Sequence, residues 1–327
     1  MPAITRFVLS CLLLSLLGLA PALAGEDTSY TLRVDGLART YLVHRPPGGA
    51  GAAHPLLLVF HGGGGTARGM PRFTGLDGIA DRVGLIVVYP QGMDKHWNDG
   101  RASIRHKVDD VGFVRAILDT MERDASVDRS RIYATGISNG GIFVERLACD
   151  LADRLAGIAA VAGTLAQDYQ AQCRPARPIP VLQFDGTADP VMPYGGGNVA
   201  DFGGHGEGGV VLGVDATTAF WARMDGCAAA GPAEALPPHA LLDPTRVSRR
   251  EWSGCRGGSA VVLYAIQEGG HTWPGGPQYL PRFIVGRASR QIDASETMVR
   301  FFLEHPRNAG SLARVMPSPP LPRLAGN

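Results

Sequence analysis

Short and almost continuous apolar runs recur along the chain, which is the pattern of parallel strands that are covered on both faces. Runs of this kind occupy residues 55–60, 85–89, 131–135, 157–162, 180–184 and 261–267. Ahead of them, two runs of alternating apolar and polar residues, 29–34 and 39–45, flank Asp35-Gly36. They predict an antiparallel hairpin at a sheet edge, because Asp-Gly is favoured in tight hairpin turns.

Segments with apolar residues at helical spacing alternate with these strands. They lie around residues 76–82, from 109 through 121, after 138, at 215–224 and at 293–305. The last segment begins with Asp293, and Glu296 three residues later resembles a capping box. Strands that alternate with helices predict an α/β fold, with a mostly parallel central sheet and helices on both faces.

Residues 1–24 have the pattern of a secretory signal peptide. Arg6 precedes an apolar run over residues 7–19, and Ala22-Leu23-Ala24 forms a small-residue cleavage site before Gly25. A membrane anchor is the alternative, but the run is too short to span about 30 Å of hydrocarbon. No cysteine follows the cleavage site to take a lipid. The sequence therefore predicts a secreted or periplasmic protein whose mature chain starts near Gly25.

The rest of the chain predicts one catalytic domain over residues 25–306, because no linker rich in serine, glycine or proline separates two apolar halves. Residues 307–327 are rich in proline and predict a disordered tail. Basic and acidic residues number 31 and 30, and loss of Arg6 with the signal peptide balances them. This balance argues against a nucleic acid or an anionic membrane as partner.

Four cysteines remain once Cys11 leaves with the signal peptide, and an even number in an exported protein suits disulfides. Three pairings are possible, and no C-x-x-C pair points to zinc or redox chemistry. The sequence-local pairing is favoured because it joins segments that flank single loops: Cys149 with Cys173, and Cys227 with Cys255. Free buried thiols and a crossed pairing remain open.

The segment 133–141 combines a strand with a G-x-S-x-G turn that opens a helix. In such a nucleophile elbow only residues without side chains fit beside the serine, and Gly136 and Gly140 meet that need. The turn presents Ser138 above the carboxyl end of the strand, and the N–H of Asn139 points to where an oxyanion would form. Since no other serine has glycines at this spacing on both sides, Ser138 is the candidate nucleophile.

A serine nucleophile needs a base and an acid that orients the base, which in this architecture follow in the order Ser, Asp, His. Asp189 and His271 each come just after a buried run, so both should emerge beside Ser138 at the carboxyl edge of the sheet. Asp185 is the rival acid at the end of its strand. Asp189 is favoured because it stands on a loop with room to turn toward a histidine.

His61 and the four glycines after it close the run 55–60. The segment is either a simple tight turn or the second source of oxyanion donors, since backbone N–H groups approach a carbonyl closely only where side chains are absent. Together with the elbow, the second interpretation is the stronger, and His61 itself is expected to hold the loop.

Glycine is also dense at 195–209, but this segment does not open a helix directly after a strand, as a phosphate-binding loop would. It predicts a flexible surface loop.

Five motifs carry a resemblance to a known family. They read FHGGGG at 60–65, VDDVGF at 108–113, GISNGG at 136–141, GTADP at 186–190 and GHTWPG at 270–275. In this order they resemble the polyhydroxybutyrate depolymerase and feruloyl esterase group of secreted α/β-hydrolases, which is related to carbohydrate esterase family one. The motifs span most of the mature chain.

The resemblance implies an α/β-hydrolase fold with Ser138 as nucleophile, Asp189 as acid and His271 as base. It further implies oxyanion donors at the N–H groups of Gly63 and Asn139.

One position departs from the family pattern. Asp185 stands where such proteins usually carry histidine, and it adds a second carboxylate near the triad loop. No appended polymer-binding or carbohydrate-binding module is evident in the sequence.

These observations predict a secreted serine carboxylic-ester hydrolase that acts on feruloyl or acetyl esters of carbohydrates, or on hydroxyalkanoate esters. A serine peptidase of the same fold and an inactive binding protein are the alternatives. Trp97 and Trp273 either line the substrate pocket or are ordinary packing aromatics. The expected partner is an ester substrate, with no nucleic acid, no membrane after signal cleavage, and no metal or cofactor. The sequence leaves the oligomeric state open.

Overall fold

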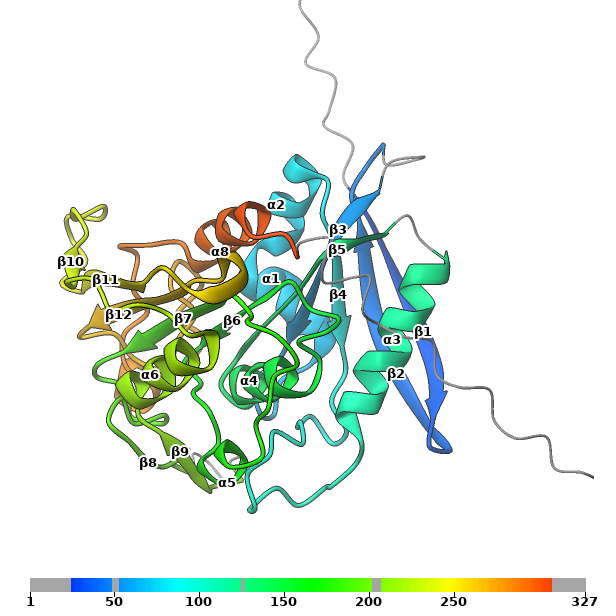
Figure 1. Ribbon diagram of the computed structural model, residues 1–327, viewed down its shortest axis with the longest axis horizontal. Coiled ribbons are helices and arrows are strands. Elements are labelled where there is room, and N and C mark those ends of the chain that lie inside the picture. Colours follow the sequence, from blue (N-terminus) through cyan, green and yellow to red (C-terminus); the bar gives the residue numbers. More distant parts are fainter. Residues whose placement is uncertain (1–24, 49–52, 125–126, 202–206, 308–327) are drawn as a thin grey trace, which may run out of the picture.

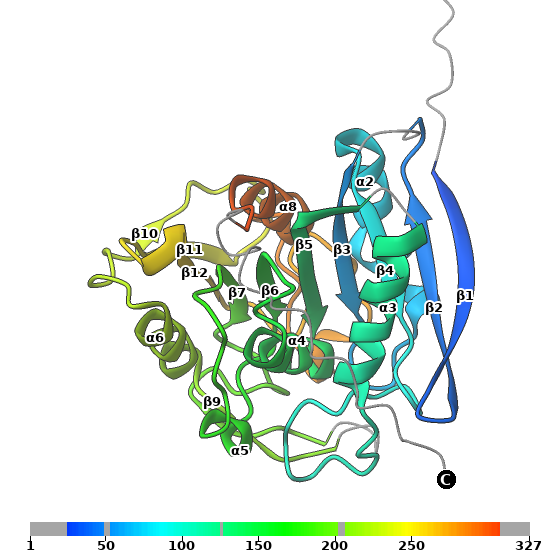
Figure 2. The ribbon, with the colours of Figure 1, turned by 45° about the vertical axis from the view of Figure 1, so that its right-hand side comes forward.

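A ten-stranded mixed sheet runs through the protein, whose computed structural model describes residues 25–48, 53–124, 127–201 and 207–307 (Figure 1). In sheet order the strands are β1 (Glu26–Val34), β2 (Leu37–Arg45), β4 (Ile86–Pro90), β3 (His54–Phe60), β5 (Val127–Ile137), β6 (Gly157–Val161), β7 (Val181–Gly186), β12 (Val261–Gln267), β11 (Arg246–Trp252) and β10 (Glu234–Ala235). The strands from β4 to β12 in this order are parallel, and antiparallel strands flank them at both edges (Figure 2).

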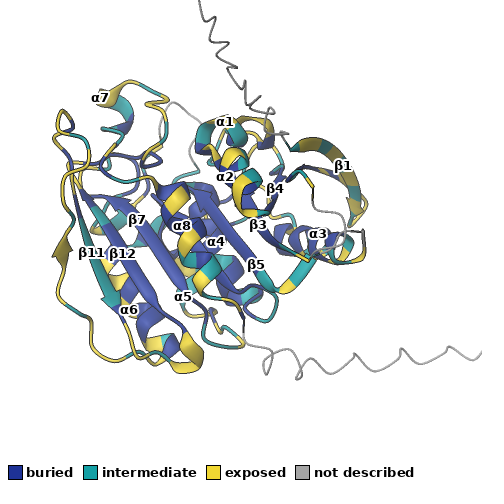
Figure 3. Ribbon diagram, turned by 90° about the horizontal axis from the view of Figure 1, so that it is seen from above, coloured by how far each residue is buried: buried dark blue, intermediate teal, exposed yellow. Residues whose placement is uncertain are grey.

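Both faces of the central strands are buried, as the apolar runs predict (Figure 3). Along β3, Leu56, Leu58 and Phe60 belong to the core on one face, and Leu57 and Val59 belong to the core on the other. This alternation follows from the period of two residues in a strand.

Helices cover each face of the sheet. Those that pack on the face of Leu56 are α3 (Asp110–Asp124), α4 (Asn139–Asp150) and α6 (Val214–Asp225). Those on the opposite face are α2 (Leu76–Val83) and α8 (Ala294–Glu304). Three shorter helices lie in the connections: α1 (Met70–Thr74), α5 (Gln167–Gln170) and α7 (Arg282–Val285). The expected α/β fold, with helices on both faces of a mostly parallel sheet, is confirmed.

The ends of the chain differ slightly from the expectation. The predicted signal peptide and residues 308–327 lie outside the described residues. Arg307, which the sequence assigned to the tail, is buried and donates hydrogen bonds to the backbone oxygens of Arg129 and Ser130. Within the described ranges, no helix combines the length and the apolar character needed to cross a bilayer.

Two local expectations need correction. Asp293 caps α8 by accepting a hydrogen bond from the N–H of Glu296, at 3.0 Å, but the side chain of Glu296 pairs with Arg82 on α2 and does not complete a capping box. The glycine-rich segment is not a loop throughout, because β8 (Gly196–Asn198) pairs with β9 (Val210–Leu212). Val211 is buried in a small apolar cluster, and its burial stabilises a hairpin that the spacing of the glycines does not predict.

Two disulfides join the cysteines in the expected sequence-local pairing, Cys149 with Cys173 and Cys227 with Cys255. Cys149 lies on α4, directly after the elbow, and Cys173 lies in the segment that leads to β7. The first disulfide therefore ties the elbow helix to the chain that enters the next strand of the site.

We expect the double replacement of Cys149 and Cys173 by alanine to lower the free energy of unfolding by about 3 kcal/mol, because the bridge closes a loop of 24 residues in the unfolded chain. Equilibrium denaturation in urea measures the change. The double replacement of Cys227 and Cys255 is the matched control: its loop is similar, but it lies far along the chain from the elbow. Only the first variant should also slow the ester hydrolysis that the sequence predicts, and equal rates in both variants would contradict the link to the elbow.

Candidate active site

Ser138 stands between the end of β5 and the start of α4, in a backbone conformation with φ of 59°. This left-handed region is unfavourable for a residue with a side chain and is found where the surroundings enforce it. A side chain at Gly136 would collide with the backbone of Gly140, and one at Gly140 would collide with the backbone oxygens of Phe60 and His61. The G-x-S-x-G turn thus forms a tight elbow, and its two glycines are required by close backbone approach.

The backbone of Ser138 is fixed while its side chain stays half-buried at the surface. Its N–H donates to the backbone oxygen of Val161 on β6, at 3.0 Å, and its own backbone oxygen accepts from Ile142 at 2.9 Å. The elbow is therefore held from the neighbouring strand on one side and from the first turn of α4 on the other.

Asp189 and His271 meet at the same edge of the sheet. The carboxylate oxygen Oδ2 of Asp189 lies 2.8 Å from Nδ1 of His271, and both side chains are almost fully buried. The other oxygen, Oδ1, accepts hydrogen bonds from the N–H groups of Val191 and Met192, at 2.7 and 2.8 Å. Both carboxylate oxygens are thus satisfied, and the acid is oriented toward the imidazole.

Backbone contacts bring the two loops together. β7 and β12 are adjacent parallel strands, and the loops after them are joined by a hydrogen bond from the N–H of Ala188 to the oxygen of Gly269, at 3.0 Å. A side chain at Gly186 would collide with the backbone of Gly269. The hydroxyl of Tyr279 also donates to the backbone oxygen of His271, at 3.0 Å.

The glycine loop after β3 lies against the elbow. A side-chain carbon placed on Gly62 would come within 3.3 Å of Cβ of Ser138. Among the described residues, the N–H of Gly63 has no hydrogen-bond acceptor. The N–H of Asn139 belongs to the first turn of α4, where such groups have no acceptor within the helix. These two N–H groups belong to the residues that the sequence predicts as oxyanion donors, and that role stays a prediction.

A network of polar contacts holds this loop in place. The ring of His61 is fully buried, and its Nδ1 contacts the oxygen of Gly62 at 2.8 Å while Nε2 accepts from the N–H of Gly92 at 3.0 Å. Burial lowers the pKa of His61 to about 4, although the contact with the Gly62 oxygen works against it. His61 is therefore neutral at pH 7 and acts as a fixed part of the loop.

The family model described as Phospholipase/Carboxylesterase matches residues 48–201, which include the glycine loop, Ser138 and Asp189. NocK of Nocardia uniformis subsp. tsuyamanensis, a protein named as an esterase, is 34% identical over 292 residues, which are 86% of this chain and 84% of that protein. The chain belongs to this carboxylesterase family. The resemblance inferred from the five motifs is confirmed.

One further relative and two solved structures are also similar to this chain. Feruloyl esterase B of Piromyces equi is 33% identical over 240 residues, which are 71% of this chain but only 42% of that longer protein. The solved structure of acetyl xylan esterase from Aspergillus awamori has a TM-score of 0.58 at 14% identity, covering 84% of this chain and 98% of that one. Native sOPH has a TM-score of 0.56 at 16% identity, covering 92% and 94%. At these identities the two structures support the fold alone.

Asp185, the rival acid, lies near the end of β7, and among the described residues no hydrogen bond or ion pair joins its side chain to His271. Burial raises the pKa of its carboxyl well above the usual range, and the charges of Asp189 and Glu145 add to the effect, against a hydrogen bond from Gly163. Within the described part of the chain, its Oδ2 has no hydrogen-bond partner. Burial therefore favours the uncharged form of the Asp185 carboxyl, whereas Asp189 is the acid whose side chain reaches the imidazole.

Both tryptophans named from the sequence are buried inside the esterase. The ring of Trp97 stacks on Phe143 at 5.3 Å, and its Nε1 donates to the oxygen of His61 at 2.9 Å. The Nε1 of Trp273 donates to the hydroxyl of Ser295 at 3.0 Å. Of the two interpretations offered by the sequence, these contacts fit packing aromatics, and Trp97 in addition supports the glycine loop.

The side chain of Asn139 has a role that the sequence did not indicate. Its Oδ1 accepts from the N–H of Trp97 at 2.8 Å, and its Nδ2 donates to the backbone oxygen of Trp97 and to Asp99. Asn139 therefore links the elbow to the segment that carries Trp97. The sequence assigned a role only to the backbone N–H of Asn139, as an oxyanion donor. No local sequence pattern indicates the partners of its side chain.

The sequence also did not indicate a role for Glu145, a buried acid on the helix that follows the elbow. Glu145 on α4 is fully buried and accepts hydrogen bonds from Gln183 and from Nε1 of Trp221. Burial raises the pKa of Glu145 to about 8, and the two hydrogen bonds only partly oppose this. Its partners come from two other elements, β7 and α6, so only the folded chain assembles the group.

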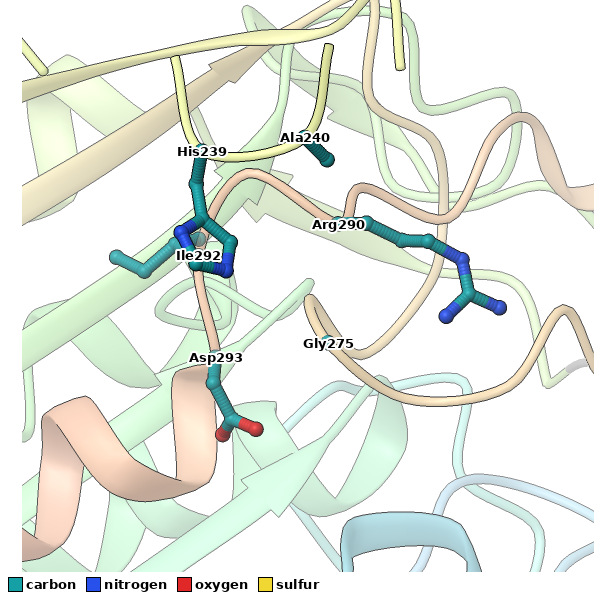
Figure 4. A pocket seen from close by; sticks show the side chains of 6 residues that line it. All are labelled: His239, Ala240, Gly275, Arg290, Ile292 and Asp293. Atoms are coloured by element: carbon teal, nitrogen blue, oxygen red, sulfur yellow. The ribbon is translucent and has the colours of Figure 1, made fainter. Parts of the chain in front are cut away.

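A cavity of about 360 Å³ opens beside the loop that follows His271 (Figure 4). Its lining residues are His239, Ala240, Gly275, Arg290, Ile292 and Asp293. None of the three candidate catalytic side chains lines it, so it does not outline the acyl pocket. Among the described residues, the one group that could hold a metal ion is Asp27, His44 and Asp77, at the edge hairpin and on α2.

We expect Asp189→Asn to lower turnover by about 10⁴-fold, because a neutral amide favours the wrong tautomer of His271. Asp185→Asn is the matched control, since an amide has nearly the shape of a carboxyl and the carboxyl of Asp185 is not hydrogen-bonded to His271 among the described residues. It should leave turnover nearly unchanged. Steady-state kinetics on a p-nitrophenyl ester measures both variants, and the reverse ranking would move the acid role to Asp185.

We expect Trp97→Phe to lower the free energy of unfolding by about 1–2 kcal/mol, because it leaves the buried oxygen of His61 without its donor. The glycine loop should also lose its position, so that kcat falls. Trp252→Phe, on β11 at the far side of the sheet, is the control and should leave kcat unchanged. Urea denaturation and ester kinetics test the pair. Unchanged kcat in Trp97→Phe would show that this contact does not position the loop.

Proposed function

We propose that this protein is an exported serine carboxylic-ester hydrolase that acts through Ser138, His271 and Asp189. The contact of 2.8 Å between Asp189 and Nδ1 of His271 carries the proposal, because it orients a histidine at the edge of the sheet where the strained Ser138 elbow ends β5. A base oriented by a buried acid, next to a serine on a tight turn, is the arrangement that activates a hydroxyl for attack on a carbonyl.

The tautomer of His271 follows from its contact with Asp189. The carboxylate accepts the proton of Nδ1, so the lone pair of Nε2 is available as the base. Nε2 takes the proton as Oγ of Ser138 forms a bond to the ester carbonyl carbon. The resulting imidazolium is stabilised by the charge of Asp189, which is buried with it.

The carbonyl oxygen gains negative charge in this step, and the N–H groups of Gly63 and Asn139 would receive it. The tetrahedral intermediate then collapses, the bond to the alcohol oxygen breaks, and the alcohol leaves with the proton from Nε2. Water attacks the acyl-enzyme in the same way, returning its proton through His271 and releasing the acid. Every group required for both halves of the reaction belongs to the chain itself.

Esters of carbohydrates, feruloyl or acetyl, are the favoured substrates, and hydroxyalkanoate esters are the second candidate. Support comes from the names of relatives, which include feruloyl esterase B of Piromyces equi and a bifunctional acetylxylan esterase/xylanase of Neocallimastix patriciarum. A peptidase of the same fold is less favoured, because these relatives are named as esterases. Export is supported by the two disulfides, which persist in oxidising compartments.

We expect Ser138→Ala and His271→Ala each to lower kcat by about 10⁴-fold or more, and the double variant to be little worse than either, because the two side chains act as a unit. Circular dichroism should show an unchanged fold. Labelling with a fluorophosphonate, followed by peptide mapping, should modify Ser138. Labelling of another serine would overturn the assignment.

We further expect a panel of substrates to show turnover of methyl ferulate or acetylated xylan above that of hydroxybutyrate oligomers. Faster turnover of the oligomers would assign the protein to polyester degradation while leaving the mechanism in place. Cleavage of peptides without cleavage of any ester would contradict the proposed reaction.

A further inference from the structure

A buried histidine at the edge hairpin is surrounded by carboxylates. His44 on β2 lies opposite Asp27 in the β1–β2 register, and its Nδ1 lies 2.8 Å from Oδ1 of Asp27. Its Nε2 lies 2.9 Å from Oδ1 of Asp81. Asp77 lies 3.8 Å away, and it stands four residues before Asp81 on α2, so both acids face the hairpin.

The charges of this cluster do not balance. Burial of the ring disfavours a charged imidazole, but the hydrogen bonds to Asp27 and Asp81 and the charge of Asp77 prevail and raise the pKa of His44. Both ring nitrogens face carboxylate oxygens, which accept hydrogen bonds, so the ring that donates to both is an imidazolium, and it faces three carboxyl groups. Tyr89 donates a hydrogen bond to Asp77, which satisfies one oxygen without adding positive charge. Asp27 is about half exposed, whereas Asp77 and Asp81 are each about one quarter exposed.

Gly25 occupies the remaining side of the cluster. Its backbone nitrogen lies 3.2 Å from Oδ2 of Asp81, the oxygen that His44 does not use. A side chain at this position would collide with the ring of His44 and with the backbone oxygen of Arg45. The residue is therefore seated directly on the imidazole, and only glycine fits there.

We propose that Gly25 is the first residue of the mature protein and that Asp81 binds its α-ammonium group, so that removal of residues 1–24 completes the ion cluster around His44. The proposal uses the export that the preceding section infers, but it does not depend on esterase activity. It assigns the cluster a specific occupant, namely the new amino terminus of this chain.

The physical reason is the change in charge at one atom. In the uncleaved chain the nitrogen of Gly25 is a neutral amide, which can donate one hydrogen bond to Asp81. After cleavage it is an ammonium group with a usual pKa of about 8, and a charged donor makes a stronger hydrogen bond to a carboxylate. Cleavage therefore strengthens the link between β1, at the exposed edge of the sheet, and α2, which packs on the sheet face.

A divalent metal ion is the other cation that such a group could bind, since Asp27, His44 and Asp77 offer ligand atoms within 4.8 Å of one another. Both nitrogens of His44 are already engaged with carboxylates, however, and a protonated imidazole has no lone pair for a metal. The nitrogen of Gly25 is already within hydrogen-bonding distance of Asp81, which favours the ammonium group.

The first test is the amino-terminal sequence of protein recovered from outside the cytoplasm. It should begin with Gly25-Glu26-Asp27, and a start at any other residue would overturn the proposal. The second test compares two purified chains that begin at Gly25, one with a free α-amino group and one acetylated there. Acetylation keeps the N–H donor and removes only the charge.

Acetylation should lower the midpoint of thermal unfolding at pH 7 by about 2 °C, as expected for a partly exposed ion pair in a chain of this size. Because Asp81 raises the pKa of the amine, the difference should be present below about pH 8 and disappear as the pH rises through the folded-state pKa. Esterase activity should be equal in both chains, so a failure here is distinguishable from a failure of the proposed function.

A pair of variants tests whether Asp81 is the partner of the α-ammonium group. In Asp81→Asn the effect of acetylation should vanish, whereas in Asp77→Asn, one turn away on the same helix, it should persist. An equal effect in both variants, or no effect in the parent chain, would overturn the proposal. A rise of several degrees on adding Zn²⁺ to the acetylated chain, lost in Asp27→Asn, would assign the cluster to a metal ion instead.

Discussion

Close approach of backbones at the carboxyl edge of the parallel strands is the constraint on which the site depends. The elbow at Ser138 lies so near the end of β3 and its glycine loop that a side chain at Gly140 would overlap the backbone of Phe60 and His61, and one at Gly136 would overlap the backbone of Gly140. The strained backbone of Ser138 persists because packing on several sides enforces it. The glycines at this edge therefore serve geometry first, and the chemistry of the site follows from that geometry.

Three buried acids near the site differ in their partners and therefore in their roles. The side chains of Asp189, Asp185 and Glu145 are all buried, yet only Asp189 is hydrogen-bonded to His271 among the described residues. Asp185 and Glu145 have raised pKa values because the protein shields them from water and offers them no cation. The family position that usually carries histidine before Gly-Thr-Ala-Asp thus holds a buried carboxyl here, and its burial favours the uncharged form.

Support for the site also comes from residues outside the candidate triad. Trp97 and Asn139 connect the elbow to the glycine loop through hydrogen bonds to backbone groups. Val191 and Met192 pack in one apolar cluster with Ile142 of α4, which fixes the loop that carries Asp189. The precision of the site therefore rests on ordinary core packing, and its parts arrive from segments far apart in the sequence.

The sequence by itself indicated the parallel strands, the edge hairpin, most helices, the elbow and the order of Ser138, Asp189 and His271, because apolar periodicity and glycine spacing are local properties of the chain. It did not indicate β8, β9, β10 or β11. It also indicated both disulfides. Four cysteines in a protein predicted to be exported are expected to be oxidised, and the pairing of cysteines near one another along the chain was favoured. Only the tertiary structure decided which aspartate meets His271, that Trp97 and Trp273 are buried, and that Gly196–Asn198 joins a hairpin. These outcomes depend on burial and on partners from distant segments, such as Asp81 for Gly25. A local sequence pattern does not indicate such partners.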